Sequence, residues 1–203
     1  MSAKLVAITQ RVEVEPRHGE RRDALDQRWA AFLSACGLVA LPVPNDPAAA
    51  LALVAAAGVR GLVLTGGNDL AAYGGDAPER DATETGLLDW TAERDVPVIG
   101  VCRGMQVIQH LAGVALERVE GHVTAHQVVR IEGEPATVNS YHGFGARASV
   151  PALDVWAVAE DGVIEGVRRR DRAVVGLMWH PERLAPFAQR DVDLFRRQFS
   201  GAP

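Results

Sequence analysis

One stretch constrains this chain more than any other: an apolar run, Val96–Val101, leads into a cysteine that stands between two glycines. The run predicts a buried strand, and the amphipathic segment over residues 103–111 predicts a helix. Gly100-x-Cys102-x-Gly104 at such a junction is the cysteine form of a nucleophile elbow, a tight and strained turn. The N-terminus of the following helix favours the thiolate. The alternative is a buried cysteine that ends a core strand, and residues elsewhere must decide between the two.

Length and charge narrow the class of protein. The chain has 203 residues and a net charge of −5, with charges of mixed sign rather than in blocks, which argues against nucleic acid or an anionic membrane as partner. No linker is evident, so we predict a single domain over residues 1–203. The N-terminus lacks the apolar region of a signal peptide, and no apolar run could span a bilayer. We therefore expect a cytoplasmic protein.

The two cysteines make no disulfide framework, so we expect reduced thiols. Cys36 falls on the apolar face of a predicted helix and has no elbow around it. We expect Cys36 to pack in the core and to take no part in chemistry.

Predicted strands and helices alternate in the first half of the chain. The strands are 4–10, 38–43, 61–67 and 96–101, and the helices are about 21–36, 48–57, one that starts at the capping-box pair Asp81 and Glu84, and 103–111. The charged stretch Arg11–Arg22 is predicted as a loop, because Pro16 and Gly19 break regular structure. Apolar strands without polar alternation are buried on both faces. The expected fold class is α/β, with a mostly parallel central sheet and helices on both faces.

The second half begins with shorter strands that have one solvated face. They are predicted at 115–119, 126–132, 136–141, 154–159 and 162–170, and they favour a small antiparallel extension of the sheet. A further buried strand, 174–182, ends in His-Pro-Glu, and 187–199 is predicted as a helix.

His180 and Glu182 supply what a cysteine nucleophile needs. Such a nucleophile requires a base, and the base requires an acceptor that orients it. If the chain stays extended at the strand end, these two side chains point the same way, so Glu182 can hold the imidazole of His180. The developing oxyanion requires backbone N–H donors, which the amides of Gly67 and Arg103 can supply. The alternative interpretation of Gly66-Gly67 is a tight turn that binds no ligand.

Four motifs occur in the order found in class I glutamine amidotransferases, which the chain resembles over most of its length. They are Leu64-Thr-Gly66-Gly67-Asn68-Asp69, Gly100-Val-Cys102-Arg-Gly104-Met-Gln106, Val138-Asn139-Ser140-Tyr141-His142 and Gly176-Leu-Met-Trp179-His180-Pro181-Glu182. Cys-Arg-Gly and Gly-Gly-Asn-Asp are similar to the γ-glutamyl hydrolase branch, which includes γ-glutamyl-γ-aminobutyrate hydrolases. Ile8-Thr9-Gln10-Arg11 and the segment 24–29 resemble the small γ-glutamyl-CDP-amidate hydrolases of capsule phosphoramidate biosynthesis.

The resemblance implies a flavodoxin-like fold and a role for each motif residue. Cys102 would be the nucleophile, His180 the acid/base and Glu182 its orienter, with the Gly67 and Arg103 amides as oxyanion donors. The glutamyl end would be held by Gln106, Asn139, Ser140, Tyr141 and His142. One departure is that many members follow His142 with a second histidine or a glutamine, whereas this chain has Gly143-Phe144.

The expected activity is cysteine-dependent hydrolysis of a γ-glutamyl amide through a thioester, with γ-glutamyl-CDP-amidate as first substrate. Alternatives are a γ-glutamyl-amine hydrolase, a glutaminase subunit that passes ammonia to a synthetase, and a non-catalytic binding protein that keeps the fold. No cofactor is expected. His122 and His126 could be a metal pair, but no third ligand stands at an obvious spacing, so we expect no metal and a hydrogen-bonded wall instead. The expected partner is a small γ-glutamyl molecule, and a homodimer is left open.

Overall fold

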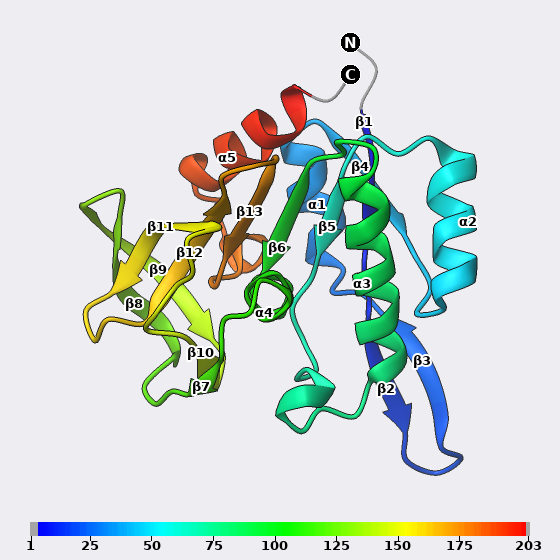
Figure 1. Ribbon diagram of the computed structural model, residues 1–203, viewed down its shortest axis with the longest axis horizontal. Helices are drawn as coiled ribbons and strands as arrows, with labels where there is room; N and C mark the ends of the chain where they lie inside the picture. The colour runs from blue at the N-terminus through cyan, green and yellow to red at the C-terminus, as the bar shows by residue number, and fades with distance from the viewer. Residues whose placement is uncertain (1–3, 202–203) are drawn as a thin grey trace.

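A computed structural model describes residues 4–201, and a nine-stranded mixed sheet runs through its centre in the order β4-β1-β5-β6-β13-β12-β11-β8-β9 (Figure 1). The parallel strands are β4 (Leu38–Pro42), β1 (Lys4–Ile8), β5 (Leu62–Leu64), β6 (Val98–Val101) and β13 (Val174–Leu177). The antiparallel strands that continue the sheet are β12 (Ile164–Arg169), β11 (Leu153–Ala159), β8 (Val123–Ile131) and β9 (Glu134–Tyr141). The predicted parallel sheet with an antiparallel extension is confirmed.

Two short pairs of strands and the helices complete the fold. The pairs are β2 (Arg11–Glu15) with β3 (Glu20–Ala24), and β7 (Glu117–Arg118) with β10 (Phe144–Gly145). The helices are α1 (Arg28–Ala35), α2 (Pro47–Ala57), α3 (Pro78–Ala92), α4 (Arg103–Leu111) and α5 (Gln189–Ser200), with single 3-10 turns η1 (Ala71–Tyr73) and η2 (Pro181–Arg183). None of the helices in residues 4–201 combines the length and apolarity needed to cross a bilayer.

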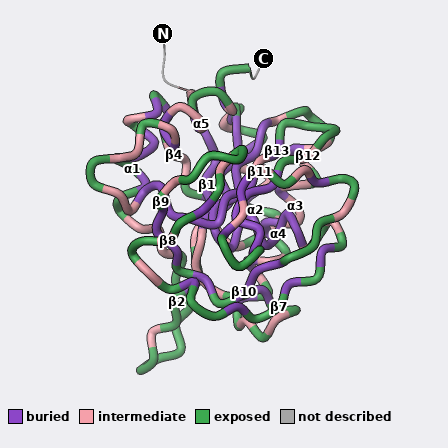
Figure 2. The backbone as a smooth tube through the Cα atoms, turned by 90° about the vertical axis from the view of Figure 1, so that its left-hand side faces the viewer, coloured by how far each residue is buried: buried purple, intermediate pink, exposed green. Residues whose placement is uncertain are grey.

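The helices cover both faces of the sheet and create two cores. Phe32 of α1 and Phe195 of α5 belong to the core on one face, with their rings 4.8 Å apart. Helices α2, α3 and α4 supply the other core, for example through Leu87. Successive residues of a strand point to opposite faces, so within β1 Ile8 enters the first core and Ala7 the second. Figure 2 shows the resulting buried centre and an exposed hairpin tip.

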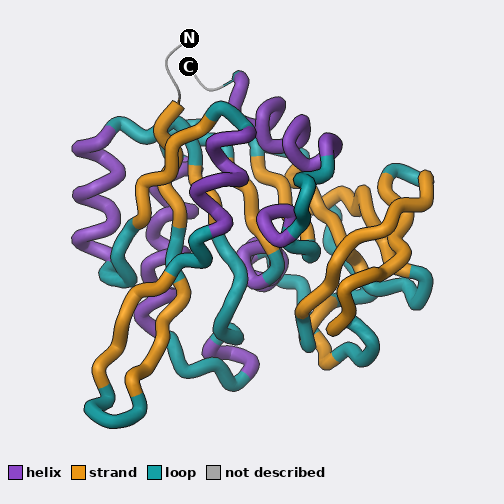
Figure 3. The backbone as a smooth tube through the Cα atoms, turned by 180° about the vertical axis from the view of Figure 1, so that it is seen from behind, coloured by secondary structure: helices purple, strands orange, loops and turns teal. Residues whose placement is uncertain are grey.

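The prediction of a loop over Arg11–Arg22 was wrong, because these residues form the β2–β3 hairpin that projects from the body (Figures 1 and 3). Its register is held by five consecutive residue pairs, and Gly19 in its turn has a φ of +66°. The hairpin is anchored at its base, where the Asn68 side chain accepts from the Val12 amide and donates to the Val12 carbonyl. Since β3 occupies residues 20–24, helix α1 starts at Arg28 rather than near Arg21.

The capping-box prediction for Asp81 and Glu84 was also wrong. Helix α3 starts earlier, at Pro78, so both residues lie inside it. Their carboxylates form ion pairs with the guanidinium of Arg103 instead of capping the helix. Proline at the first helical position explains the earlier start, because its fixed φ suits that position and it needs no N–H acceptor.

The glycines of the elbow allow α4 to pack directly on the sheet. A Cβ on Gly100 would stand 2.6 Å from the carbonyl carbon of Gly104, and a Cβ on Gly104 would overlap the Leu64 carbonyl oxygen. We therefore expect Gly104→Ala to lower the free energy of unfolding by about 1–3 kcal/mol, because backbone atoms must separate. Gly86→Ala in α3 is the matched control: its Cβ would meet only Leu51 at 3.8 Å. That substitution should raise stability by about 1 kcal/mol. Urea unfolding of both variants checks the pair, and equal stabilities would contradict the packing argument.

Candidate active site

The carboxyl ends of three neighbouring parallel strands bring the predicted residues together. Strand β5 leads into Gly66 and Gly67, β6 into Cys102, and β13 toward His180. The Cys102 amide donates to the Leu177 carbonyl at 2.8 Å, which joins the elbow to the end of β13. Ligands of parallel α/β sheets bind at this edge.

Cys102 has the strained backbone expected of an elbow. Its φ is +53° and its ψ is −107°, a region that non-glycine residues rarely occupy. Cys102 is 6% exposed, and its Sγ lies 4.0 Å from the Tyr141 carbonyl oxygen. Cys36 lies in the core on the α1/α5 face, as expected, where burial raises the pKa of its thiol to about 12.

His180 and Glu182 form a buried pair, although the geometry differs from the expectation. His180 Nδ1 lies 2.8 Å from Glu182 Oε1, and both side chains are almost fully buried. The strand ends at Leu177, and Glu182 lies in the 3-10 turn η2 rather than on an extended chain. The pairing therefore comes from a single 3-10 turn and not from strand alternation.

Asn139 holds the backbone of His180. Its Oδ1 accepts from the His180 amide and its Nδ2 donates to the His180 carbonyl, each at 2.8 Å. The Asn139 side chain therefore holds the His180 backbone in place, while the role of Asn139 toward substrate stays a prediction. The Ser140 hydroxyl likewise bonds inside the protein, to the His122 carbonyl at 2.8 Å.

The electrostatic surroundings of His180 favour its protonated form. Burial alone would lower its pKa, but the Cys102 thiolate and the Glu182 carboxylate outweigh burial and raise the pKa to about 9. A protonated imidazole beside a cysteine stabilises the thiolate, which is the reactive form of a cysteine nucleophile.

The backbone N–H groups of Gly67 and Arg103 were predicted as oxyanion donors. Within residues 4–201, neither the Gly67 N–H nor the Arg103 N–H donates to another group of the chain. Gly66 faces His180 and Cys102: a Cβ there would lie 2.6 Å from His180 Cε1 and 3.4 Å from Cys102 Cβ. Both amides are thus free to bind a ligand beside the thiol.

A hollow of about 350 Å³ opens beside Cys102. It is lined by Gly67, Asn68, Asp69, Cys102, Arg103, Gln106, Tyr141, His142 and Gly143. Three of the predicted substrate residues thus line it, and Asn139 and Ser140 do not. The side chain of Gln106 donates through Nε2 to the Phe144 carbonyl oxygen at 2.9 Å.

A buried cluster of His122, His142 and Glu165 includes one residue, His142, that lines this hollow. Glu165 Oε1 lies 3.0 Å from His122 Nδ1 and 3.4 Å from His142 Nε2. These residue types could hold a metal ion, and the ligand atoms lie within 4.8 Å of one another. The hydrogen bond to Glu165 raises the pKa of His122. His126 is exposed and takes no part, and the sequence analysis missed Glu165 because no motif surrounds it.

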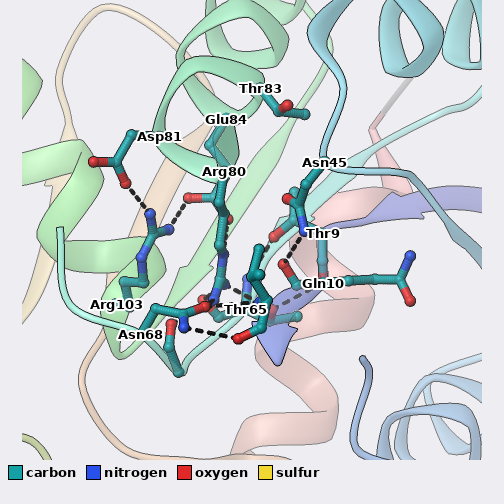
Figure 4. Close-up of polar contacts among 12 residues, drawn as sticks. Thr9, Gln10, Asn45, Thr65, Asn68, Arg80, Asp81, Thr83, Glu84 and Arg103 are labelled. Carbon is teal, nitrogen blue, oxygen red and sulfur yellow. Dashed lines mark hydrogen bonds and ion pairs between the residues drawn. The ribbon is translucent and has the colours of Figure 1, made fainter. Parts of the chain in front are cut away.

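Arg80 was missed as well. Its guanidinium is completely buried against the Gly66-Gly67 turn, between that turn and Glu84 (Figure 4). An arginine in a charged, Asp- and Gly-rich segment looks like a solvated residue in the sequence.

Comparison with known proteins identifies a family and several relatives of this chain. The family model described as Peptidase C26 matches residues 4–129 and 119–182. The chain is 31% identical over 127 residues to the γ-glutamyl-CDP-amidate hydrolase of Campylobacter jejuni, covering 62% of this chain and 63% of that protein. It is 29% identical over 135 residues to the γ-glutamyl-γ-aminobutyrate hydrolase of Escherichia coli O157:H7, covering 52% and 53%. The chain thus matches less than two thirds of the length of either relative.

A solved structure shares the fold. The glutamine amidotransferase of Thermotoga maritima superposes with a TM-score of 0.69, over 98% of this chain and 84% of that chain. Its sequence identity is 16%, so the likeness concerns the fold alone.

Proposed function

This chain belongs to the peptidase C26 family of the class I glutamine amidotransferase-like superfamily, and on that premise we propose that it hydrolyses a γ-glutamyl amide with a Cys102-His180-Glu182 triad. The observation that carries the proposal is the strained, buried Cys102 beside an imidazole that Glu182 orients at 2.8 Å. In this proposal, residues 1–203 form a single domain.

In the first step His180 accepts the proton of the Cys102 thiol, which leaves a thiolate beside an imidazolium. The Cys102 thiolate attacks the γ-carbonyl carbon of the substrate, and the carbonyl oxygen takes the negative charge. The Gly67 and Arg103 amides donate to that oxygen in the tetrahedral intermediate. His180 then protonates the leaving nitrogen, the C–N bond breaks, and a γ-glutamyl thioester remains on Cys102.

Hydrolysis of the thioester repeats these steps with water. Neutral His180 accepts a proton from the water as the water oxygen attacks the thioester carbonyl. The second tetrahedral intermediate uses the same two amides, and its collapse expels the Cys102 thiolate and releases glutamate. Glu182 stabilises the imidazolium each time it forms.

The proposed substrate is a γ-glutamyl amide with a leaving group larger than ammonia, and γ-glutamyl-CDP-amidate is the first choice. The relative at 31% identity is a hydrolase of that compound, and the closer motifs of this sequence point the same way. γ-Glutamyl-γ-aminobutyrate is the second choice, from the relative at 29% identity. A glutaminase subunit of an amidotransferase is the alternative that the shared fold also supports.

We expect the purified chain alone to hydrolyse γ-glutamyl-CDP-amidate with a kcat/KM at least about 100-fold above that for glutamine. The leaving group adds binding energy that ammonia cannot supply, and the free Gly67 and Arg103 amides require no partner to form the oxyanion site. Steady-state kinetics with γ-glutamyl-CDP-amidate, γ-glutamyl-γ-aminobutyrate and glutamine measures the ratio. Glutamine hydrolysis that starts only when a second protein is added would assign the chain to an amidotransferase instead.

A further inference from the structure

Arg80 binds the loop that contains one proposed oxyanion donor. Its guanidinium donates to the carbonyl oxygens of three successive residues: Thr65 at 2.7 Å, Gly66 at 3.1 Å, and Gly67. It also contacts Thr65 Oγ1 at 3.1 Å, Asn68 Oδ1 at 3.2 Å and, through Nε, Glu84 Oε1 at 3.0 Å. All three of its nitrogens are therefore engaged, which suits a planar group with five N–H donors.

These contacts determine which way the Gly67 amide points. In a trans peptide the C=O of one residue and the N–H of the next point in opposite directions. The Gly66 carbonyl points at Arg80, so the N–H of Gly67 points away from Arg80. Gly66 itself faces the catalytic pair, since a Cβ on it would lie 2.6 Å from His180 Cε1. Arg80 thus selects the peptide orientation that leaves the Gly67 N–H free to donate.

The second proposed donor is tied to the same helix. The Arg103 side chain forms ion pairs with Glu84 and Asp81 of α3, while its backbone N–H begins α4 next to Cys102 (Figure 4). Glu84 bridges the two guanidiniums, because one of its oxygens binds Arg80 and the other binds Arg103. One turn of α3 therefore connects both oxyanion segments.

The charges of this cluster balance inside the protein. Arg80, Arg103 and Glu84 are fully buried, and Asp81 is 23% exposed at the edge. Burial alone would raise the pKa of Glu84, but the Arg103 and Arg80 guanidiniums outweigh it and hold that pKa below its ordinary value. Burial lowers the pKa of Arg80 to about 10, so Arg80 remains charged at neutral pH. Buried charges of this kind require defined partners, which gives the cluster a fixed geometry.

We propose that Arg80, held by Glu84, is a positioning residue that keeps the Gly67 N–H aimed at the oxyanion, and that the Glu84 bridge aligns this donor with the Arg103 N–H. The inference rests on the proposed function, because it assigns these amides to the oxyanion. Arg80 touches neither the thiol nor the substrate hollow, and it acts only through the peptide it holds.

The test is Arg80→Lys, which keeps the charge and loses the planar fork that reaches three carbonyls. We expect kcat for the best γ-glutamyl amide to fall about 100-fold with KM changed less than about threefold, the loss typical of one oxyanion donor. The pH profile of Cys102 alkylation by iodoacetamide should stay at its wild-type position, because that reaction requires no oxyanion donor. A merely structural role would instead lower thermal stability and change KM and alkylation together.

Two further variants keep the test decisive. Asp81→Asn, at the exposed edge of the cluster, should lower kcat about tenfold at unchanged KM and serves if Arg80→Lys does not fold. Arg94→Lys, an exposed arginine just beyond the end of α3, is the matched control and should leave kcat unchanged. Wild-type kcat in a folded Arg80→Lys would overturn this inference and leave the proposed function standing. If Arg80→Lys does not fold, wild-type kcat in a folded Asp81→Asn would do the same. Wild-type protein that hydrolyses no γ-glutamyl amide would instead overturn the proposed function.

Discussion

Cys102→Ala is expected to lower turnover of γ-glutamyl amides by about 10⁵-fold or more, because no thioester can form without the nucleophile. The fold should survive, since the change removes one sulfur atom from a side chain that still touches solvent. Steady-state rates, together with mass spectrometry of acid-quenched enzyme to detect the thioester, give the measurement. Circular dichroism and the melting temperature show whether the variant is folded.

Cys36→Ala is the matched control for the nucleophile. Its thiol is buried in the core on the α1/α5 face, and its raised pKa keeps it protonated and unreactive. We expect this substitution to lower stability by about 1 kcal/mol and to leave kcat within about twofold of wild type. Near-normal turnover in Cys102→Ala, or loss of turnover in Cys36→Ala, would contradict the assignment of the nucleophile.

The second large effect is expected at the acid/base pair. His180→Ala should lower kcat by about 10⁶-fold, because His180 serves both the leaving nitrogen and the attacking water. Glu182→Gln should lower kcat by about 10⁴-fold, because an amide can still contact the ring and stabilises imidazolium poorly. Wild-type rates in both variants would exclude this triad.

The pH dependence of Glu182→Gln gives a second measurement on the same pair. The folded pKa of His180 is raised to about 9, partly by the Glu182 carboxylate. Protonated His180 is the acid for the leaving group, so wild-type kcat/KM should fall as the pH rises through about 9. Removing the carboxylate removes part of the upward shift, and this alkaline limb should move to lower pH. A limb that stays in place would show that Glu182 does not set the charge of His180.

Local sequence was sufficient for those parts of the site whose residues are neighbours in the chain. The elbow was predicted because Gly100, Cys102 and Gly104 stand at a fixed spacing between a strand and a helix, and all three take the expected conformation and packing. His180 and Glu182 were predicted as a pair because alternate side chains of an extended chain point the same way. The pair forms, but through the 3-10 turn η2 rather than through an extended strand end. The parallel half of the sheet followed from alternating strands and helices, since parallel neighbours need helical crossovers.

Tertiary structure decided the contacts between segments that are distant in the chain. Asn139 reaches His180 from 41 residues away, and Arg103 reaches Asp81 from 22 residues away. Neither partner can be identified from spacing, and the local pattern at Asp81 and Glu84 even favoured a helix cap that α3 does not use. The same holds for the β2–β3 hairpin. Its charged residues predict a loop, but hydrogen bonds from the distant Asn68 to Val12 anchor the base of a hairpin. Local patterns reflect the periodicity of backbone and side chains, whereas the partner of a buried charge depends on strand order and helix packing, which the whole chain determines.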